Sequence, residues 1–321
     1  MQQQTRVLQR LTLKIPASAG NIGPGLDAVG LALGLYASLS FTLYDKPQLD
    51  KAVVSLQGPI KDLSTEGDQT QLIYTMLRRL WSEGSELLQR VRVDVESEIP
   101  LGAGLGSTAA TILGSLWASK VLQDSVPTKD SLIGEGVALE GYPETLAASL
   151  IGDFVVCAPS ADGHRYLSQQ LHWPERWKAL LVVPPYRLRT AQARAVLGRK
   201  VPLDQAVTNI QRTALLVSAV AARDEAALKE ALKDELHEQP RMTMVPELSE
   251  LRALLKYEPA LGCVLSGAGP SILVLVAENN KELIKERLQE WLKQKEGRKP
   301  TILDVPVDRE GMQIVQHEIV S

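Results

Sequence analysis

Cysteine and phenylalanine are scarce in this chain, with two of each among 321 residues. The two cysteines, Cys157 and Cys263, cannot form a disulfide framework or a closed zinc site by themselves. The four histidines are scattered and lack metal-ligand spacing. Aromatic residues make up only 4% of the chain, so leucine, valine, isoleucine and alanine must form the core.

Long apolar runs and an excess of one charge are missing as well. No stretch is long enough to span a bilayer, and residues 1–6 lack the apolar segment of a signal peptide. The formal net charge is -3, which argues against a surface for nucleic acid or anionic lipid. We therefore expect a cytoplasmic protein that has no nucleic-acid and no membrane partner.

Hydrophobic periodicity predicts strands and helices that do not alternate strictly, which favours an α+β fold. Strands are predicted over residues 7–15, 36–43, 151–158, 178–183, 262–265, 271–276 and 301–305. Helices are predicted over residues 69–81, 109–117, 130–140, 203–221, 224–233, 246–256 and 280–294. We expect Pro16 to end the first strand, and the last helix to pack one apolar face on a sheet. The turn-rich residues 159–163 favour two domains, 1–165 and 166–321.

A glycine-rich segment lies between an apolar strand pattern and a helix. Its glycines at 102, 104 and 106 permit tight turns and a close approach of backbone N–H groups to an anion. The helix that follows adds unpaired N–H donors, and Ser107 and Thr108 add two hydroxyls. The segment has neither the lysine of a Walker loop nor the last glycine of the dinucleotide fingerprint. It predicts a phosphate cradle of another type; a simple turn without a ligand is the alternative.

Two more glycine-rich segments occur at residues 16–27 and 265–271. Each alone could be only a turn between strands. With residues 100–110 they resemble the motifs of the small-molecule kinases named after galactokinase, homoserine kinase, mevalonate kinase and phosphomevalonate kinase, and most closely those of homoserine kinases. The likeness continues in Thr190–Leu197, Asn209–Arg212 and Asp234–Arg241, and it covers about residues 12–276.

The resemblance implies a fold, a reaction and an assembly. The N-terminal domain would be like domain 2 of ribosomal protein S5, the C-terminal domain would be ferredoxin-like, and the site would lie between them. The reaction would be ATP-dependent phosphorylation of the side-chain hydroxyl of L-homoserine to O-phospho-L-homoserine, a step of threonine biosynthesis. The protein would form a homodimer.

The resemblance also implies roles for individual residues. Thr108 and Glu140 would be catalytic and would hold Mg²⁺, while no general base can be named. L-homoserine would contact Asn21, Asp27, Thr145, Arg194, Arg241 and Gly267. ATP would be bound by Pro100, Leu101, Gly102, Ala103, Gly104, Leu105, Gly106, Ser107, Thr108, Ala109 and Ala110. Without the resemblance, the same hydroxyls would only cap a helix, and the charged residues would only be surface charges.

One segment departs from the family pattern. The family commonly has Glu-Gly-His-x-Asp-Asn where residues 140–145 read Glu-Gly-Tyr-Pro-Glu-Thr. Glu140 is retained, but Tyr142, Glu144 and Thr145 replace histidine, aspartate and a substrate-contacting asparagine. Three hypotheses stay open: a slower homoserine kinase, a kinase for another small hydroxylated acid or amino alcohol, or an ATP-binding regulator with weak catalysis.

Overall fold

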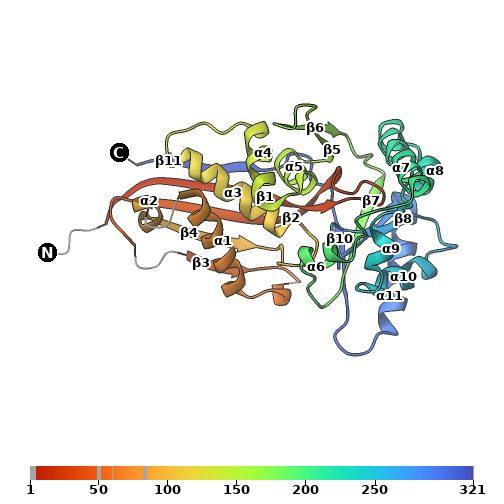
Figure 1. Ribbon diagram of the computed structural model, residues 1–321. Helices are drawn as coiled ribbons and strands as arrows, with labels where there is room; N and C mark the ends of the chain where they lie inside the picture. Colours follow the sequence, from red (N-terminus) through yellow and green to blue (C-terminus); the bar gives the residue numbers. More distant parts are fainter. Residues whose placement is uncertain (1–4, 49–51, 60, 82–84, 321) are drawn as a thin grey trace.

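The computed structural model describes residues 5–48, 52–59, 61–81 and 85–320. Two sheets organise the chain, and the long strands of the first sheet extend away from the broader part that holds the second sheet (Figure 1). The predicted α+β class is confirmed by this mixture of sheets and covering helices. No helix among these residues is long and apolar enough to cross a membrane.

The first sheet has seven strands, with the order β11-β1-β2-β4-β3 and with β5 and β6 attached to β2. The strands are β1 (Val7–Gly20), β2 (Val29–Tyr44), β3 (Ala52–Leu56), β4 (Val91–Ser97), β5 (Phe154–Pro159), β6 (Tyr166–Leu171) and β11 (Gln313–Ile319). The accompanying helices are α1 (Glu66–Trp81), α2 (Glu86–Arg90), α3 (Ser107–Val121), α4 (Lys129–Glu140) and α5 (Pro143–Ile151). Alternate residues of β1, from Leu11 to Ala19, are fully buried in the main core, as a half-buried strand requires.

The second sheet is antiparallel and has the order β10-β7-β9-β8. Its strands are β7 (Trp177–Val183), β8 (Ala260–Leu265), β9 (Ile272–Ala277) and β10 (Thr301–Val305). The helices are α6 (Thr190–Ala195), α7 (Leu203–Ala222), α8 (Glu225–Ala231), α9 (Glu238–Arg241), α10 (Pro246–Leu254) and α11 (Lys281–Lys293). Helices α6 to α10 connect β7 to β8, and α11 connects β9 to β10, which confirms the ferredoxin-like order of this domain.

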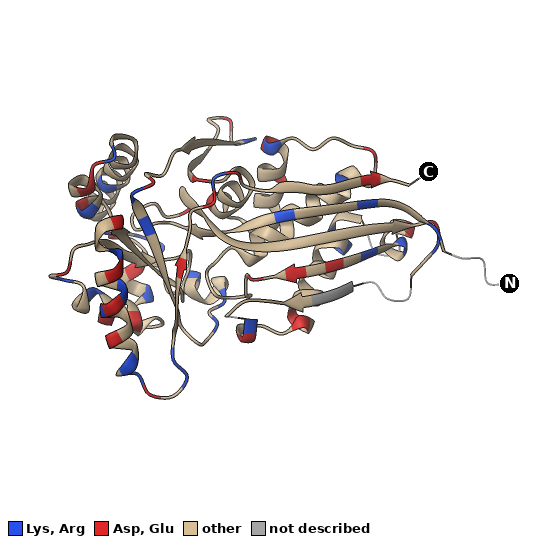
Figure 2. Ribbon diagram, turned by 180° about the vertical axis from the view of Figure 1, so that it is seen from behind, with Lys and Arg blue, Asp and Glu red and all other residues tan. Residues whose placement is uncertain are grey.

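Helix α11 is amphipathic, as its sequence predicts. Ile284, Leu288 and Trp291 are buried against the second sheet. Acidic and basic residues alternate along the rest of the helix (Figure 2). The apolar stripe therefore packs inside the domain.

The first strand continues where the sequence predicts its end. Pro16 lies within β1, and the pairing with β2 shifts register between Pro16 and Ala17. A proline is tolerated at such a bulge, where the ladder of hydrogen bonds is already interrupted. The strand therefore reaches Gly20 and places the first glycine-rich loop beside the second sheet.

The predicted boundary between residues 165 and 166 does not separate the two sheets. Strand β6 still pairs with β5 of the first sheet, and β11 returns from the far end of the chain to pair with β1 (Figure 1). Most side chains of β11 are exposed, so the segment has no buried face for periodicity to reveal. The C-terminal segment therefore completes the N-terminal domain.

Candidate active site

The segment from Gly102 to Gly106 forms a tight loop before α3. Gly102, Gly104 and Gly106 all have positive φ, between 69° and 75°. A Cβ at Gly104 would lie 2.4 Å from the carbonyl oxygen of Ser266, and one at Gly106 would lie 2.1 Å from Ser18 Oγ. The loop therefore needs glycine both for its backbone conformation and for its close packing.

Four successive carbonyl groups of this loop point into the protein. The oxygens of Gly102, Ala103, Gly104 and Leu105 accept hydrogen bonds from Leu188 N–H, Ser271 N–H, Ser266 Oγ–H and Ser18 N–H. The donors come from three separate segments of the two domains: the residues before α6, the β8–β9 loop and β1. These bonds fix the orientation of the loop.

The amide groups of the loop remain available as donors. Within the described part of the chain, the N–H groups from Gly102 to Thr108 make no hydrogen bond to another protein group. The left-handed Gly106 is the N-cap of α3, and no side chain caps this helix. The hydroxyls of Ser107 and Thr108 are therefore not capping groups, and together with the start of α3 they offer hydrogen-bond donors of the kind that suits an anion.

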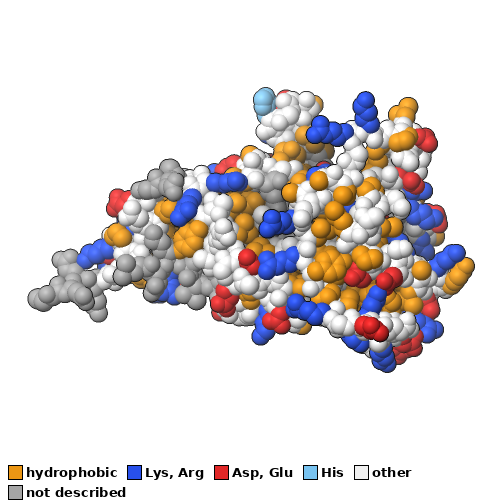
Figure 3. Space-filling view, turned by 60° about the horizontal axis from the view of Figure 1, so that its bottom comes forward, with side chains coloured by type: hydrophobic (Ala, Val, Ile, Leu, Met, Phe, Trp, Pro, Cys, Tyr) orange, Lys and Arg blue, Asp and Glu red, His pale blue; other side chains and the backbone are white. Residues whose placement is uncertain are grey.

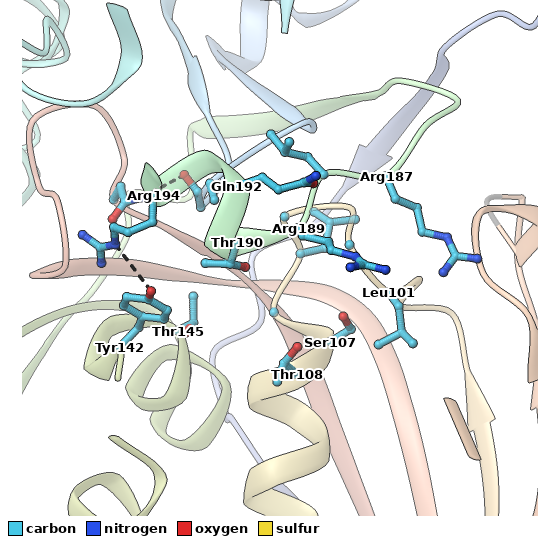
Figure 4. A pocket seen from close by; sticks show the side chains of 18 of the residues that line it. Leu101, Ser107, Thr108, Tyr142, Thr145, Arg187, Arg189, Thr190, Gln192 and Arg194 are labelled. Carbon is cyan, nitrogen blue, oxygen red and sulfur yellow. Dashed lines mark hydrogen bonds between the residues drawn. The ribbon is translucent and has the colours of Figure 1, made fainter. Parts of the chain in front are cut away.

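A cavity of about 570 Å³ opens beside this loop. Basic side chains gather near the middle of the face in Figure 3, between the narrow and the broad parts of the molecule. Figure 4 shows Ser107 and Thr108 at one end of the cavity, and Arg194 with Tyr142 at the other. The cavity thus joins an anion cradle to a second polar region.

Arg194 of α6 lies at that second region. Its Nη2 donates to both carboxylate oxygens of Asp27, at 2.6 and 2.8 Å. Its guanidinium also stacks on the Tyr142 ring at 4.5 Å, and Nε donates to the Tyr142 hydroxyl at 3.4 Å. Burial lowers the pKa of Arg194, but the bonds to Asp27 and Tyr142 outweigh it and raise the pKa overall. Opposite charges are thus held side by side in the cavity wall.

Arg241 of α9 is almost fully buried, with 2% of its surface exposed, and it also lines the cavity. Its Nε donates to the Ala193 carbonyl at 3.1 Å, and Nη1 donates to His237 Nδ1 at 2.9 Å. His237 Nε2 lies 2.7 Å from the Gly23 carbonyl, to which it can donate while Nδ1 accepts from Arg241. Burial, and then the charge of Arg194, lower the pKa of Arg241.

The first glycine-rich loop is fixed by partners that are distant in sequence. Asn21 Nδ2 donates to the Gly267 carbonyl at 2.8 Å, and Asn21 Oδ1 accepts from Asp27 N–H at 3.0 Å. Asn209 Nδ2 donates to the Pro24 carbonyl at 2.8 Å. The segments around Asn209 and His237 therefore support the loop that presents Asp27.

The segment that departs from the family pattern also faces the cavity. Tyr142, Glu144 and Thr145 all line it, at the start of α5. Glu144 is 3% exposed, and a Cβ added at Gly20 would lie 2.7 Å from Glu144 Oε1. The replacements thus change the wall of the cavity directly.

Most of the predicted site residues meet at this cavity, although they come from six regions of the chain. Those that line it are Asn21, Asp27, Leu101, Gly102, Gly104, Leu105, Gly106, Ser107, Thr108, Thr145, Arg194, Arg241 and Gly267. Four predicted ATP-binding residues do not line it: Pro100, Ala103, Ala109 and Ala110. Their side chains are buried because they point toward the core and away from the cavity.

The predicted metal ligand Glu140 is described only by its backbone. Its side chain lies outside the described residues, and its backbone ends α4. Three residues that were not predicted, Arg187, Arg189 and Gln192, line the cavity just before and within α6. The only signal for them is their position next to the Thr190–Leu197 motif. No cluster of three acidic, histidine or cysteine side chains that could hold a metal occurs among the described residues.

Comparison with known proteins agrees with this arrangement. Residues 71–158 match the family of GHMP kinases N terminal domains, and residues 216–294 match that of GHMP kinases C terminal domains. The chain is therefore a GHMP kinase, a class that takes its name from the four kinases above.

Two relatives identify the family within this class, and one solved structure shares its fold. The chain is 32% identical to a homoserine kinase of Aquifex aeolicus (strain VF5), over 95% of this chain and 99% of that protein. It is 32% identical to a homoserine kinase of Desulfitobacterium hafniense, over 87% of this chain and 92% of that protein. A crystal structure of homoserine kinase from Cytophaga hutchinsonii shares the fold, with a TM-score of 0.76, 23% identity and coverage of 95% and 97%. The chain belongs to the homoserine kinase family.

Proposed function

We propose that this protein transfers the terminal phosphoryl group of ATP to the side-chain hydroxyl of L-homoserine, giving O-phospho-L-homoserine and ADP in threonine biosynthesis. The observation that carries the proposal is the union of two sites in one cavity. One end offers amides and hydroxyls that have no partner among the described residues, and the other offers Asp27 beside Arg194 and Arg241. A small amino acid with an ammonium, a carboxylate and a hydroxyl matches the second end.

The cradle fits the phosphates of ATP. Gly104 and Gly106 leave room where a Cβ would collide with Ser266 and Ser18, and the amides from Gly102 to Thr108 have no protein acceptor among the described residues. Magnesium would neutralise charge on the phosphates. Thr108 would hold it together with Glu140, because Mg²⁺ commonly takes one or two protein oxygens and keeps phosphate and water ligands.

The acceptor would be oriented by charge. Asp27 would accept hydrogen bonds from the substrate ammonium, while Arg194 and Arg241 would bind its carboxylate. Arg241 Nη2 has no protein partner among the described residues, so it is free to donate into the cavity. The side-chain hydroxyl would then lie toward the cradle. Positioning of this kind suits a loose phosphoryl-transfer transition state, in which no strong general base is needed.

The replacements at Tyr142, Glu144 and Thr145 favour a second candidate, phosphorylation of another small hydroxylated acid or amino alcohol. Thr145 offers one hydroxyl where an asparagine would offer both a donor and an acceptor. The stacking of Tyr142 on Arg194 keeps the carboxylate end in place. We therefore place homoserine first and an altered acceptor second.

The test is product formation from ATP, Mg²⁺ and L-homoserine, with the product identified by mass spectrometry. Formation of O-phosphohomoserine together with equal amounts of ADP supports the proposal. ADP release only with other hydroxylated acids or amino alcohols supports the altered acceptor. Nucleotide binding without product from any acceptor supports a regulatory role. Glu140→Gln tests the metal site, because it should raise the Mg²⁺ concentration needed for half-maximal rate at least tenfold.

We also propose that the protein acts in the cytoplasm as a homodimer. The thiols of Cys157 and Cys263 are both free, which suits a reducing compartment. Helix α7 exposes Leu203 and Ile210, at 79% and 68%, beside Val207. Such an apolar helix face is suited to contact with a second copy. Light scattering of the wild type and of a Leu203→Ser, Ile210→Ser variant would test the assembly.

A further inference from the structure

Four arginines line the cavity, and they differ in their partners. Arg187 donates to Asp68 Oδ2 at 2.8 Å. Arg194 is paired with Asp27, and Arg241 is held by His237 and the Ala193 carbonyl. Arg189 forms no ion pair and no side-chain hydrogen bond with any residue that the structure describes. Arg189 is therefore a cation of the cavity that no described acidic side chain neutralises.

The backbone beside Arg189 is fixed. Leu188 N–H donates to the Gly102 carbonyl at 2.8 Å, and the Leu188 side chain is buried in the core of the second domain. Helix α6 begins at Thr190. The backbone of Arg189 is therefore held between Leu188, which is bonded to the glycine loop, and the first residue of α6.

The side chain of Arg189 is directed into the cavity. In Figure 4 its guanidinium lies on the side of Ser107 and Thr108, whereas Arg194 lies on the side of Tyr142. Thr190 lies between the two arginines in that view. Arg189 therefore stands where the phosphate cradle meets the region assigned to the acceptor.

We propose that Arg189 binds the terminal phosphate of ATP and stabilises its transfer; this inference rests on the proposed function. In the transfer, the acceptor oxygen forms a bond to the terminal phosphorus. The bond from that phosphorus to the bridging oxygen breaks, and its electron pair leaves with ADP. The hydroxyl proton passes to a phosphate oxygen or to water. Charge on the equatorial oxygens persists throughout, and a planar guanidinium can donate two hydrogen bonds to them.

The glycine loop by itself lacks a cation for this group. The segment has no lysine, and the other three arginines are engaged by acidic or buried partners. Arg189 follows the strand β7 and is separated from Gly102 by 87 positions in the sequence, so no local motif around the loop reveals it. The fold supplies the charge that a Walker loop carries within its own sequence.

The experiment compares Arg189→Gln and Arg189→Lys with Arg199→Gln, which removes the same charge at an exposed position outside the cavity. Affinity is measured by calorimetry for AMPPCP and for ADP, which differ in the terminal phosphate. Arg189→Gln should weaken AMPPCP at least tenfold and ADP less than twofold. Arg189→Lys should lie between, and Arg199→Gln should match the wild type. Equal weakening of both nucleotides, or no change, would overturn the assignment.

Turnover gives a second readout. Arg189→Gln should lower kcat by a hundredfold or more and leave the KM of the acceptor unchanged. If the wild type phosphorylates homoserine and Arg189→Gln has the same kcat, Arg189 has no part in the transfer, while the proposed function stands. A wild type that binds neither nucleotide would contradict the proposed function itself. Equal thermal midpoints of the variants exclude unfolding as the cause.

Discussion

Gly104→Ala is the substitution whose effect follows most directly from the geometry. Gly104 has a φ of 75°, and an added Cβ would lie 2.4 Å from the Ser266 carbonyl oxygen and 2.6 Å from that of Gly269. An L side chain in this conformation costs about 1 kcal/mol. Moving two backbone segments apart costs a further ~1–3 kcal/mol. We therefore expect a loss of about 2–4 kcal/mol in the free energy of unfolding.

Gly134→Ala is the matched control. Gly134 lies inside α4, and a Cβ there would meet nothing within 4 Å. Alanine is favoured over glycine in a helix by about 1 kcal/mol, so this change should stabilise the protein. The same chemical substitution thus has opposite signs at the two sites.

The measurement is thermal unfolding of both variants together with AMPPCP binding. Gly104→Ala should lower the unfolding midpoint and weaken AMPPCP at least tenfold, because the loop carbonyls that orient the amides must shift. Gly134→Ala should raise the midpoint slightly and bind as the wild type does. A Gly104→Ala variant with wild-type stability and affinity would refute the reasoning about the loop.

Three other predictions address the acceptor site and pH. Asp27→Asn removes the carboxylate that faces Arg194, and a lost charged hydrogen bond of about 1.5–3 kcal/mol should raise the homoserine KM roughly 10- to 150-fold without changing the ATP KM; steady-state kinetics checks this. Thr145→Asn should increase kcat/KM for homoserine, and an unchanged value would locate any defect elsewhere in residues 142–145. Burial, and then Asp308, raise the pKa of Tyr36 to about 12. Stability from this group is therefore complete below pH 10, its usual pKa, and is lost as the pH rises toward 12. Unfolding in urea between pH 9 and 12 should be less pH-dependent in Tyr36→Phe.

The order of the elements in the second domain was predictable because β7 and β9 are apolar and buried nearly throughout, and the last helix is buried along one face. The apolar stripe of α11 and the buried run of β9 are properties of a local sequence. The strand β11 could not be predicted in the same way, since it pairs at an edge with most side chains exposed. The passage of β1 through Pro16 depends on a bulge against β2, which is a contact between distant segments.

The candidate site likewise has one part that follows from the local sequence and another part that depends on contacts between distant segments. The sequence by itself determined the tight glycine loop before α3, because glycine at 102, 104 and 106 permits the left-handed backbone of this short segment. Only the tertiary structure decided which charges meet: Asp27 and Arg194 are 167 positions apart, and Arg194 Nη2 donates to both carboxylate oxygens of Asp27. It also placed Arg189 at the cradle. Local chemistry fixes the shape of a loop, whereas the pairing of distant charges requires the packing of two domains.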